Sequence, residues 1–216
     1  MKKITLLLLS FLNFMLHSSE NSPINSILVP INKTDIHTKD NYDNTPLHLA
    51  QNAEIAQLLL EHGADVKAKN KDGNTPLHLA QNPEIARLLL KNGANPNEKN
   101  RFGGTPLHCV KNQETAAVLL AAGGKVNQID DKGNTPLHCV RTKKIAKLLV
   151  KYGADIEAFN KNNLTVDAVA FHNSTIIDLA IEDEEYTDGY NYHGYGSSKE
   201  DYYDAARYLL ELKSAK

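Results

Sequence analysis

Four histidines that recur at one spacing are the residues of this sequence best suited to chemistry. His48, His78, His108 and His138 lie 30 residues apart, each at the end of a Thr-Pro-Leu-His tetrapeptide. Imidazole binds metals and transfers protons, so the series could form a ladder of metal sites. Equivalent residues of stacked units lie about 8–10 Å apart, however, whereas zinc holds its ligand atoms at about 2 Å. We therefore predict structural histidines, no metal and no cofactor.

Two cysteines could form a disulfide. Cys109 and Cys139 directly follow the last two of these histidines and so occupy one equivalent position in adjacent units. The stacking distance of about 8–10 Å exceeds the Cα separation of about 4.4–6.8 Å that a disulfide requires. We therefore predict two reduced thiols buried in the core.

The sequence offers no residues from which an active site can be assembled. It has no nucleophile with an adjacent base, no phosphate-binding glycine loop and no His-Glu-x-x-His pair. With 41% hydrophobic and 23% charged residues among 216, its composition is that of an ordinary globular chain. The net charge of −2 argues against a general nucleic-acid binder. We predict a protein that is not an enzyme and binds no nucleic acid.

Helix-capping residues surround each histidine and indicate the elements that position it. In the second copy, Thr75 suits a helix N-cap and Pro76 the first helical position, where its missing N–H costs nothing. Asn82 and Pro83 repeat this signature for a second helix, which Gly93 ends in the left-handed conformation. Each unit is therefore predicted as two helices joined by a tight turn and followed by a polar loop.

Apolar residues recur at helical spacing within the second predicted helix. Ile85, Leu88 and Leu89 fall at i, i+3 and i+4, which predicts a buried stripe. A single helix pair cannot bury this stripe and must stack on the next pair. Blocks 44–63, 74–93 and 134–153 superimpose without a gap. The sequence therefore predicts an all-α repeat solenoid.

The motif Thr-Pro-Leu-His-x-Ala resembles the signature of ankyrin repeats, over roughly residues 35 to 181. The resemblance implies an ankyrin solenoid of stacked helix-turn-helix units with protruding β-turn fingers. The period is 30 residues here, against about 33 in the family. The missing residues fall between the helices, where Ala80–Pro83 replaces the usual Gly-His turn. We expect a short first helix and leave the curvature of the stack open.

The repeat register divides the chain into segments. We assign residues 1–19 to a signal peptide, 20–42 to an N-terminal cap or half repeat, 43–72, 73–102, 103–132 and 133–162 to four ankyrin repeats, 163–181 to a degenerate fifth repeat, 182–197 to an acidic Tyr/Gly-rich loop, and 198–216 to a C-terminal capping helix. Within the last helix, Ala206, Leu209 and Leu210 are spaced as a buried stripe that docks back on the array.

The first twenty residues are typical of a secretory signal peptide. Lys2 and Lys3 precede an apolar run from Ile4 to Leu16, and small polar residues follow. This run is shorter than the roughly 20 apolar residues of a membrane-spanning helix. We expect export to the periplasm or beyond it, with a retained N-terminal anchor or a mis-assigned start as alternatives. Because no later segment is long and apolar enough, we expect no membrane insertion of the mature chain.

The segment from Asp178 to Asp204 carries nine acidic residues and one basic residue. Glu182 to Glu185 are consecutive acids that precede Tyr186, and further tyrosines stand among glycines. Tyr186 therefore fits a tyrosine-kinase substrate, whose modification would add negative charge. A solvated insertion explains the same composition, and both interpretations stay open.

The resemblance implies that protein partners bind at the loop tips and on the exposed concave side of the first helix. The matching positions vary between repeats while the frame stays constant, and Tyr42, Arg101 and Phe102 are the candidate hot spots. Simple solvent exposure is the alternative at each position. The predicted contacts are Asn41, Tyr42, Gln51, Lys71, Asp72, Gln81, Arg101, Phe102, Lys111, Asp131, Lys132 and Arg141.

The Asn- and Lys-rich composition, the N-terminal signal and the compact repeats resemble ankyrin proteins of intracellular bacteria. We predict a monomeric, exported scaffold for a protein partner of unknown identity, with a host-directed role as the leading hypothesis. A periplasmic structural or assembly module is the second hypothesis. An adaptor regulated through Tyr186 is the third.

Overall fold

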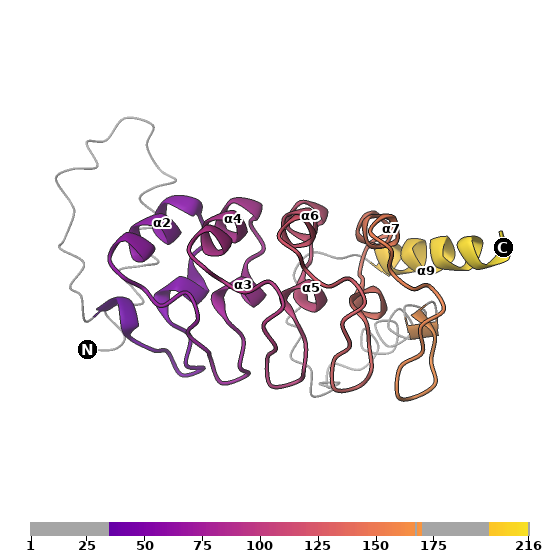
Figure 1. Ribbon diagram of the computed structural model, residues 1–216, viewed down its shortest axis with the longest axis horizontal. Coiled ribbons are helices and arrows are strands. Elements are labelled where there is room, and N and C mark those ends of the chain that lie inside the picture. Colours follow the sequence, from indigo (N-terminus) through magenta and orange to yellow (C-terminus); the bar gives the residue numbers. More distant parts are fainter. Residues whose placement is uncertain (1–34, 167, 170–198, 216) are drawn as a thin grey trace.

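The structure, a computed structural model, describes residues 35–166, 168–169 and 199–215. Within them, short and long helices alternate along the chain, and a final helix packs at the C-terminal end (Figure 1). The elements are the 3-10 helices η2 (Asp35–His37), η3 (Pro46–Leu49) and η4 (Pro136–Cys139), and the α-helices α2 (Ala53–Glu61), α3 (Pro76–Leu79), α4 (Pro83–Lys91), α5 (Pro106–Cys109), α6 (Gln113–Ala121), α7 (Lys143–Lys151) and α9 (Lys199–Ser214).

The first helix of each unit is a single turn that begins at the proline of the Thr-Pro-Leu-His motif. In α3, Thr75 is the extended N-cap and Pro76 the first helical residue, and Ala80 leaves the helix in an extended conformation. The same four residues form 3-10 helices in η3 and η4 and α-helices in α3 and α5. The short first helix expected from the missing residues is confirmed.

The second helices are nine residues long and have the predicted caps. The side chain of Asn82 accepts a hydrogen bond from the Glu84 backbone N–H at 2.8 Å. Asn52, Asn112 and Thr142 cap α2, α6 and α7 in the same way. After α4, Gly93 has a φ of +88°, which is the left-handed conformation that favours glycine. The helix-stop role predicted for the periodic glycines is therefore confirmed in the structure.

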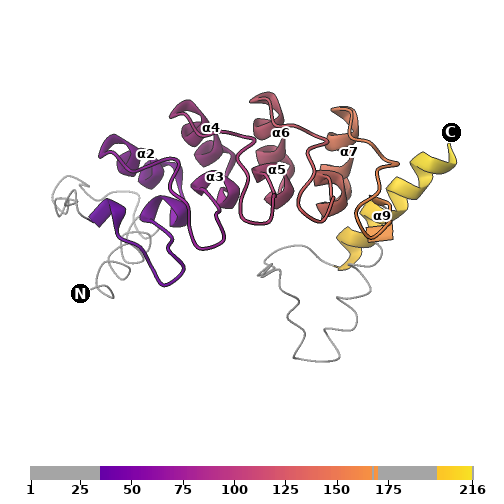
Figure 2. The ribbon, with the colours of Figure 1, turned by 60° about the horizontal axis from the view of Figure 1, so that its bottom comes forward.

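The units stack side by side, so that like helices touch like helices. Helices α2, α4, α6 and α7 form one layer, and η3, α3, α5 and η4 form the other (Figure 1). Loops project from the stack on the side away from the long helices. Seen from below, the units follow one another in a gently curved row (Figure 2). The predicted all-α ankyrin solenoid is confirmed.

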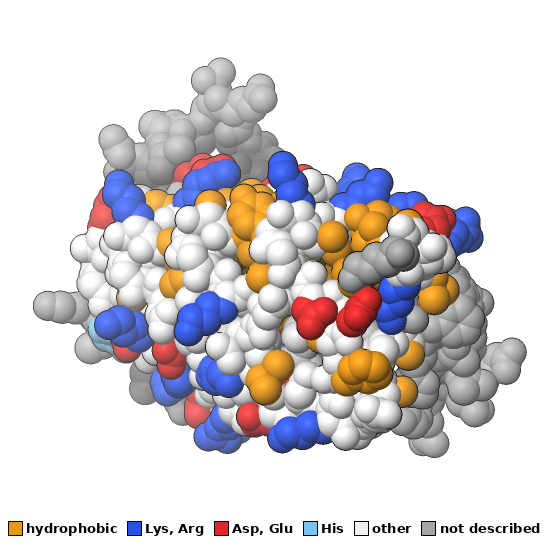
Figure 3. Space-filling view, turned by 45° about the vertical axis from the view of Figure 1, so that its right-hand side comes forward, with side chains coloured by type: hydrophobic (Ala, Val, Ile, Leu, Met, Phe, Trp, Pro, Cys, Tyr) orange, Lys and Arg blue, Asp and Glu red, His pale blue; other side chains and the backbone are white. Residues whose placement is uncertain are grey.

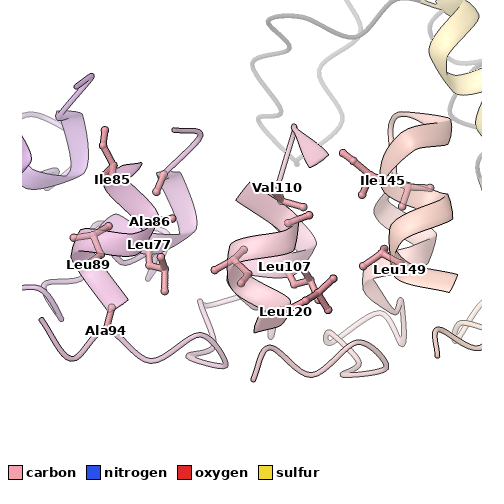
Figure 4. Close-up of a cluster of buried hydrophobic side chains, with 14 of the residues drawn as sticks. Leu77, Ile85, Ala86, Leu89, Ala94, Leu107, Val110, Leu120, Ile145 and Leu149 are labelled. Carbon is pink, nitrogen blue, oxygen red and sulfur yellow. The ribbon is translucent and has the colours of Figure 1, made fainter. Parts of the chain in front are cut away.

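The core lies between the two layers and between successive units. Ile85, Ala86 and Leu89 of α4 are buried and face Leu77 of α3 (Figure 4). Leu88, which the spacing placed in the stripe, is only half-buried. Ala86, which the spacing did not include in the stripe, is fully buried.

Helix α9 packs against α7 at the C-terminal end of the stack. Ala205 and Leu209 are fully buried in this contact, whereas Leu210 is 49% exposed. The docking of the last helix is therefore confirmed, but the placement of Leu210 in its buried stripe is wrong. The ring of Tyr208 lies 5.8 Å and 5.5 Å from the Nζ atoms of Lys143 and Lys147, which adds cation–π contacts.

Several predicted segments lie outside the described residues. They are the signal peptide, residues 20–34 of the N-terminal cap, most of the degenerate fifth repeat, the acidic Tyr/Gly-rich loop and Tyr186 within it. Within the described part, no helix combines the length and apolar character needed to cross a membrane.

Candidate functional site

The projecting loops carry eight of the predicted partner contacts at their tips. We call the loops 64–74, 94–104, 124–134 and 154–164 the fingers. The fingertip row is defined by the pairs Asn41–Tyr42, Lys71–Asp72, Arg101–Phe102 and Asp131–Lys132, and all eight residues are exposed. Tyr42 is 68% exposed and Phe102 is 38% exposed. The structure therefore brings these eight predicted contacts together on one side of the stack.

Backbone hydrogen bonds link each fingertip to the next. The Lys71 N–H donates to the Tyr42 carbonyl at 3.0 Å, and the Arg101 N–H donates to the Asp72 carbonyl at 2.9 Å. The same bond recurs from Asp131 to Phe102 and from Lys161 to Lys132. The row is thus a continuous backbone scaffold, whose spacing does not depend on the exposed side chains.

The histidines of the four Thr-Pro-Leu-His motifs hold the base of each finger. The Nδ1 atom of His78 accepts the Thr75 N–H at 3.1 Å and lies 2.9 Å from the Thr75 hydroxyl. Its Nε2 atom lies 3.2 Å from the Gly104 carbonyl of the next unit. Because a carbonyl only accepts, the proton is on Nε2 and the hydroxyl donates to Nδ1. Both ring nitrogens are used, so the predicted structural role is confirmed.

The other three histidines make the same bonds. The Nε2 atoms of His48, His108 and His138 lie 2.9, 3.0 and 3.3 Å from carbonyl oxygens of the following unit. Burial lowers the pKa of all four rings, and it lowers the pKa of His78 to about 4. The fingers are therefore held by neutral imidazoles at neutral pH.

An asparagine ladder that sequence reasoning missed runs along the finger bases. The Nδ2 of Asn70 donates to Oδ1 of Asn44 at 2.8 Å, and Asn100 donates to Asn74 at 2.9 Å. A third bond joins Asn160 to Asn134 at 2.9 Å. The partners are 26 residues apart, so aligning the repeats column by column and comparing neighbouring columns would have found them.

The ladder is interrupted between the fingers 94–104 and 124–134. Gly104 stands where the other units have a side-chain acceptor, and Asp130 stands where they have a donor. Asp130 is buried and accepts hydrogen bonds from Lys132 N–H and from Asn134 instead. Within the part of the chain that the structure describes, this junction therefore has no side-chain rung.

A second set of glycines with positive φ was also missed. Gly73, Gly103 and Gly133 lie just after the fingertips, with φ of +74°, +73° and +79°. A Cβ on Gly103 would lie 2.8 Å from the backbone nitrogen of Asp131. The equivalent positions are held by Asp43, in the loop 38–44 before the first finger, and by Asn163 in the last finger, with φ of 61° and 58°. Both are residue types that tolerate this conformation.

The four predicted contacts at the base of the concave side differ from the fingertips. Gln51 is exposed, but Gln81 and Lys111 are half-buried and Arg141 is only 8% exposed. The expectation that all four positions are exposed is therefore wrong, because neighbouring repeats cover the later ones.

Gln81 is bonded into the next unit. Its Oε1 accepts the Lys111 N–H at 3.0 Å, and its backbone carbonyl accepts the Thr115 hydroxyl at 3.0 Å and the Asn112 amide. A side chain held in this way joins repeats, which is a structural role that the sequence did not indicate.

Cationic side chains surround the two thiols in this region. Both cysteines are free and half-buried, not fully buried as predicted. Burial raises the pKa of Cys109 to about 11, although nearby Arg141 and Lys111 act in the opposite direction. The pKa of Lys111 is lowered, mainly by burial and secondly by repulsion from Arg141. These thiols are protonated at neutral pH and poorly suited to nucleophilic chemistry.

Sequence reasoning also missed the exposed residue two positions before each fingertip. This position is held by Lys69, Lys99, Ile129 and Phe159, and the residues after Lys69 and Ile129 are buried. Ile129 is 50% exposed and Phe159 is 59% exposed. The signal was available, because each lies two residues before a fingertip residue and so faces the same way in an extended strand.

The geometry defines a class of protein: a repeat solenoid that offers a rigid row of variable loop tips. A family model of ankyrin repeats in three copies matches residues 14–100 and 81–160. The chain therefore belongs to the ankyrin-repeat family, and its repeats form a protein-interaction scaffold. A comparison with curated proteins gave no significant match. No group of side chains that could hold a metal ion occurs among the described residues.

Proposed function

We propose that this ankyrin solenoid binds its protein partner through the fingertip row. The observation that carries the proposal is the chain of backbone bonds from Tyr42 to Lys161, which fixes exposed side chains at regular intervals. A surface organised before binding loses little conformational entropy when a partner docks. Tyr42, Arg101 and Phe102 supply the residue types in which binding energy concentrates.

Photocrosslinking tests this assignment. A photoreactive phenylalanine analogue is placed at Tyr42 or Phe102, and the matched control carries it at Tyr152. Tyr152 is 46% exposed but follows α7 on the opposite side of the stack. Partner capture at Tyr42 and Phe102 but not at Tyr152 is expected. Equal capture at all three positions, or capture at Tyr152 alone, would count against a fingertip site.

We also propose that the protein is exported and acts on a host factor. The support is the basic and apolar N-terminal segment, together with the likeness in composition to ankyrin proteins of intracellular bacteria. A periplasmic assembly module is the alternative. Cell fractionation separates the two: recovery of the chain outside the cell supports a host-directed role, and strict periplasmic retention supports the assembly module.

Regulation through Tyr186 is a third possibility, favoured by the four consecutive acids before it. Mass spectrometry of this segment after incubation with host extract and ATP tests it. A phosphate on Tyr186 supports an adaptor role, and an unmodified peptide in a phosphorylation-competent extract removes it. The array itself is proposed to act as a monomer, which light scattering of the purified chain can check.

A further inference from the structure

The finger face changes its chemistry along the solenoid. Lys69, Lys71, Lys99 and Arg101 lie on the first two fingers, whereas Ile129 and Phe159 hold the matching positions on the last two. The lower half of the space-filling view shows two separate orange patches on this face, with blue side chains beside and below them (Figure 3).

The first two fingers carry a surplus of positive charge. Lys69 is neutralised by Glu98, whose carboxylate lies 2.7 Å from its Nζ. Among the residues that the structure describes, Lys71 and Arg101 form no ion pair, and Lys99 uses its Nζ on the Ile129 carbonyl at 3.1 Å. At these tips three cations therefore outnumber a single exposed acid, Asp72. Acidic groups are attracted to this part of the face.

The last two fingers offer apolar area instead. Ile129 and Phe159 occupy the same position in adjacent units, and their side chains are exposed by 50% and 59%. At the tip of the same finger the exposed charges of Asp131 and Lys132 offset each other, so this tip carries no surplus of positive charge. The face thus has a polarity, with a surplus of positive charge on the first two fingers and exposed apolar side chains on the last two.

We propose that the finger face recognises an extended segment of the partner in which acidic residues are followed or preceded, at a fixed interval, by a bulky apolar residue. The inference rests on the proposed fingertip function and names the chemistry of its partner. Neighbouring fingers lie about 10 Å apart, and an extended chain advances about 3.3 Å per residue. One finger therefore corresponds to about three residues, and the acids lie about three to nine residues from the apolar side chain.

A phage library of random peptides, selected on the immobilised full chain, tests the proposal. The expected outcome is enrichment of peptides that combine two or more acidic residues with a bulky apolar residue about three to nine positions away. Lys71→Ser with Arg101→Ser should remove the preference for acids. Ile129→Ser with Phe159→Ser should remove the preference for the apolar residue. Each double change should weaken the selected peptides at least about tenfold, and raised salt should weaken only the acidic part.

The control combines Lys91→Ser, Lys151→Ser and Tyr152→Ser, which remove exposed cations and an exposed ring from the ends of α4 and α7. Binding by this variant should equal that of the parent chain, and melting curves should show all variants folded.

The outcomes separate this inference from the proposed function. If the selected peptides have another composition but no longer bind when Tyr42, Arg101 and Phe102 are changed to alanine, the inference is overturned and the fingertip site stands. Peptides that bind every finger variant overturn both. Failure to enrich any peptide overturns the inference, because a surface that reads a short linear pattern must select one.

Discussion

The buried histidines make the stability of the array depend on pH. His78 uses Nδ1 as an acceptor and has a folded-state pKa of about 4, against 6.5 for an unburied histidine. The unfolded chain therefore binds more protons between pH 6.5 and 4, and the free energy of unfolding falls as the pH falls through this window. The full contribution is present above pH 6.5.

We predict that His78 alone contributes about 3 kcal/mol of this pH dependence. Urea unfolding at several values between pH 7.5 and 4.5 measures it. The variant His78→Ala should be less stable at pH 7.5 and should show a smaller loss of stability on acidification. Parallel curves for the parent chain and His78→Ala would contradict the bonding scheme.

The two sets of glycines should differ in how they respond to a side chain. A Cβ at Gly93 would meet no atom within 4 Å, so Gly93→Ala adds only the strain of the left-handed conformation, about 1 kcal/mol. Gly103→Ala adds the clash with Asp131 and should lower the thermal midpoint further.

Gly93→Val should cost more than about 1 kcal/mol, whereas Lys91→Val in the exposed end of α4 should be mild. Equal melting temperatures for Gly93→Val and Lys91→Val would refute the helix-stop role.

Thiol titration tests the cysteine pair. Denatured, unreduced protein should take up two equivalents of a thiol reagent, one each for Cys109 and Cys139. In the native state at pH 7.5 the reaction should be much slower, since a pKa of about 11 leaves little thiolate at Cys109. A mass lower by two hydrogens, with no uptake, would show a disulfide and a shorter stacking distance.

At the scale of the elements, the junction between units is the feature that decides stability. Gln81 and Gln51 hold one position in adjacent repeats, but only Gln81 bonds across to the next unit. Gln81→Ala leaves the Lys111 N–H without that acceptor and should cost about 1–2 kcal/mol. Gln51→Ala should stay within about 0.5 kcal/mol. Chemical denaturation of the two variants compares them, and a larger cost for Gln51→Ala would reverse the assignment.

The helices and their caps could be predicted from the sequence because each is specified within its own unit. Thr75, Pro76, Asn82 and Gly93 act over a few residues, and four copies make the pattern plain. What failed depends on a neighbouring unit. Arg141 repeats the position of exposed Gln51, yet an adjacent surface covers it. Neither periodicity nor residue type contains that information.

The same limit applies to the candidate site. The fingertips were predicted from the resemblance to ankyrin repeats, which implies that partners bind at the loop tips. Ile129 and Phe159 were missed because the stretch before the tip was predicted as a polar loop, and Lys69 and Lys99 fit that prediction. The last helix shows a further case: Leu210 fits a helical stripe, but Ala205 and Leu209 are the buried residues where α9 packs against α7.

At the scale of the whole molecule, the central claim is that the solenoid is a rigid holder and that its fingertip row binds the partner. The residues that fix the frame and the residues that would touch a partner are different sets. Core and frame substitutions such as Leu77→Ala should lower stability by about 2–5 kcal/mol before they affect binding. Fingertip substitutions should lower affinity while the melting temperature stays constant.

The most direct test measures partner affinity beside thermal melting for a matched series of full-length variants. The partner is the protein captured by the full chain, and its dissociation constant is determined for the parent, for the triple variant Tyr42→Ala, Arg101→Ala, Phe102→Ala, and for a deletion of Glu182 to Ser197. The account predicts a loss of at least about 2 kcal/mol of binding free energy for each true hot spot, with unchanged melting. Normal binding by the triple variant, together with loss of binding by a folded deletion variant, would contradict it.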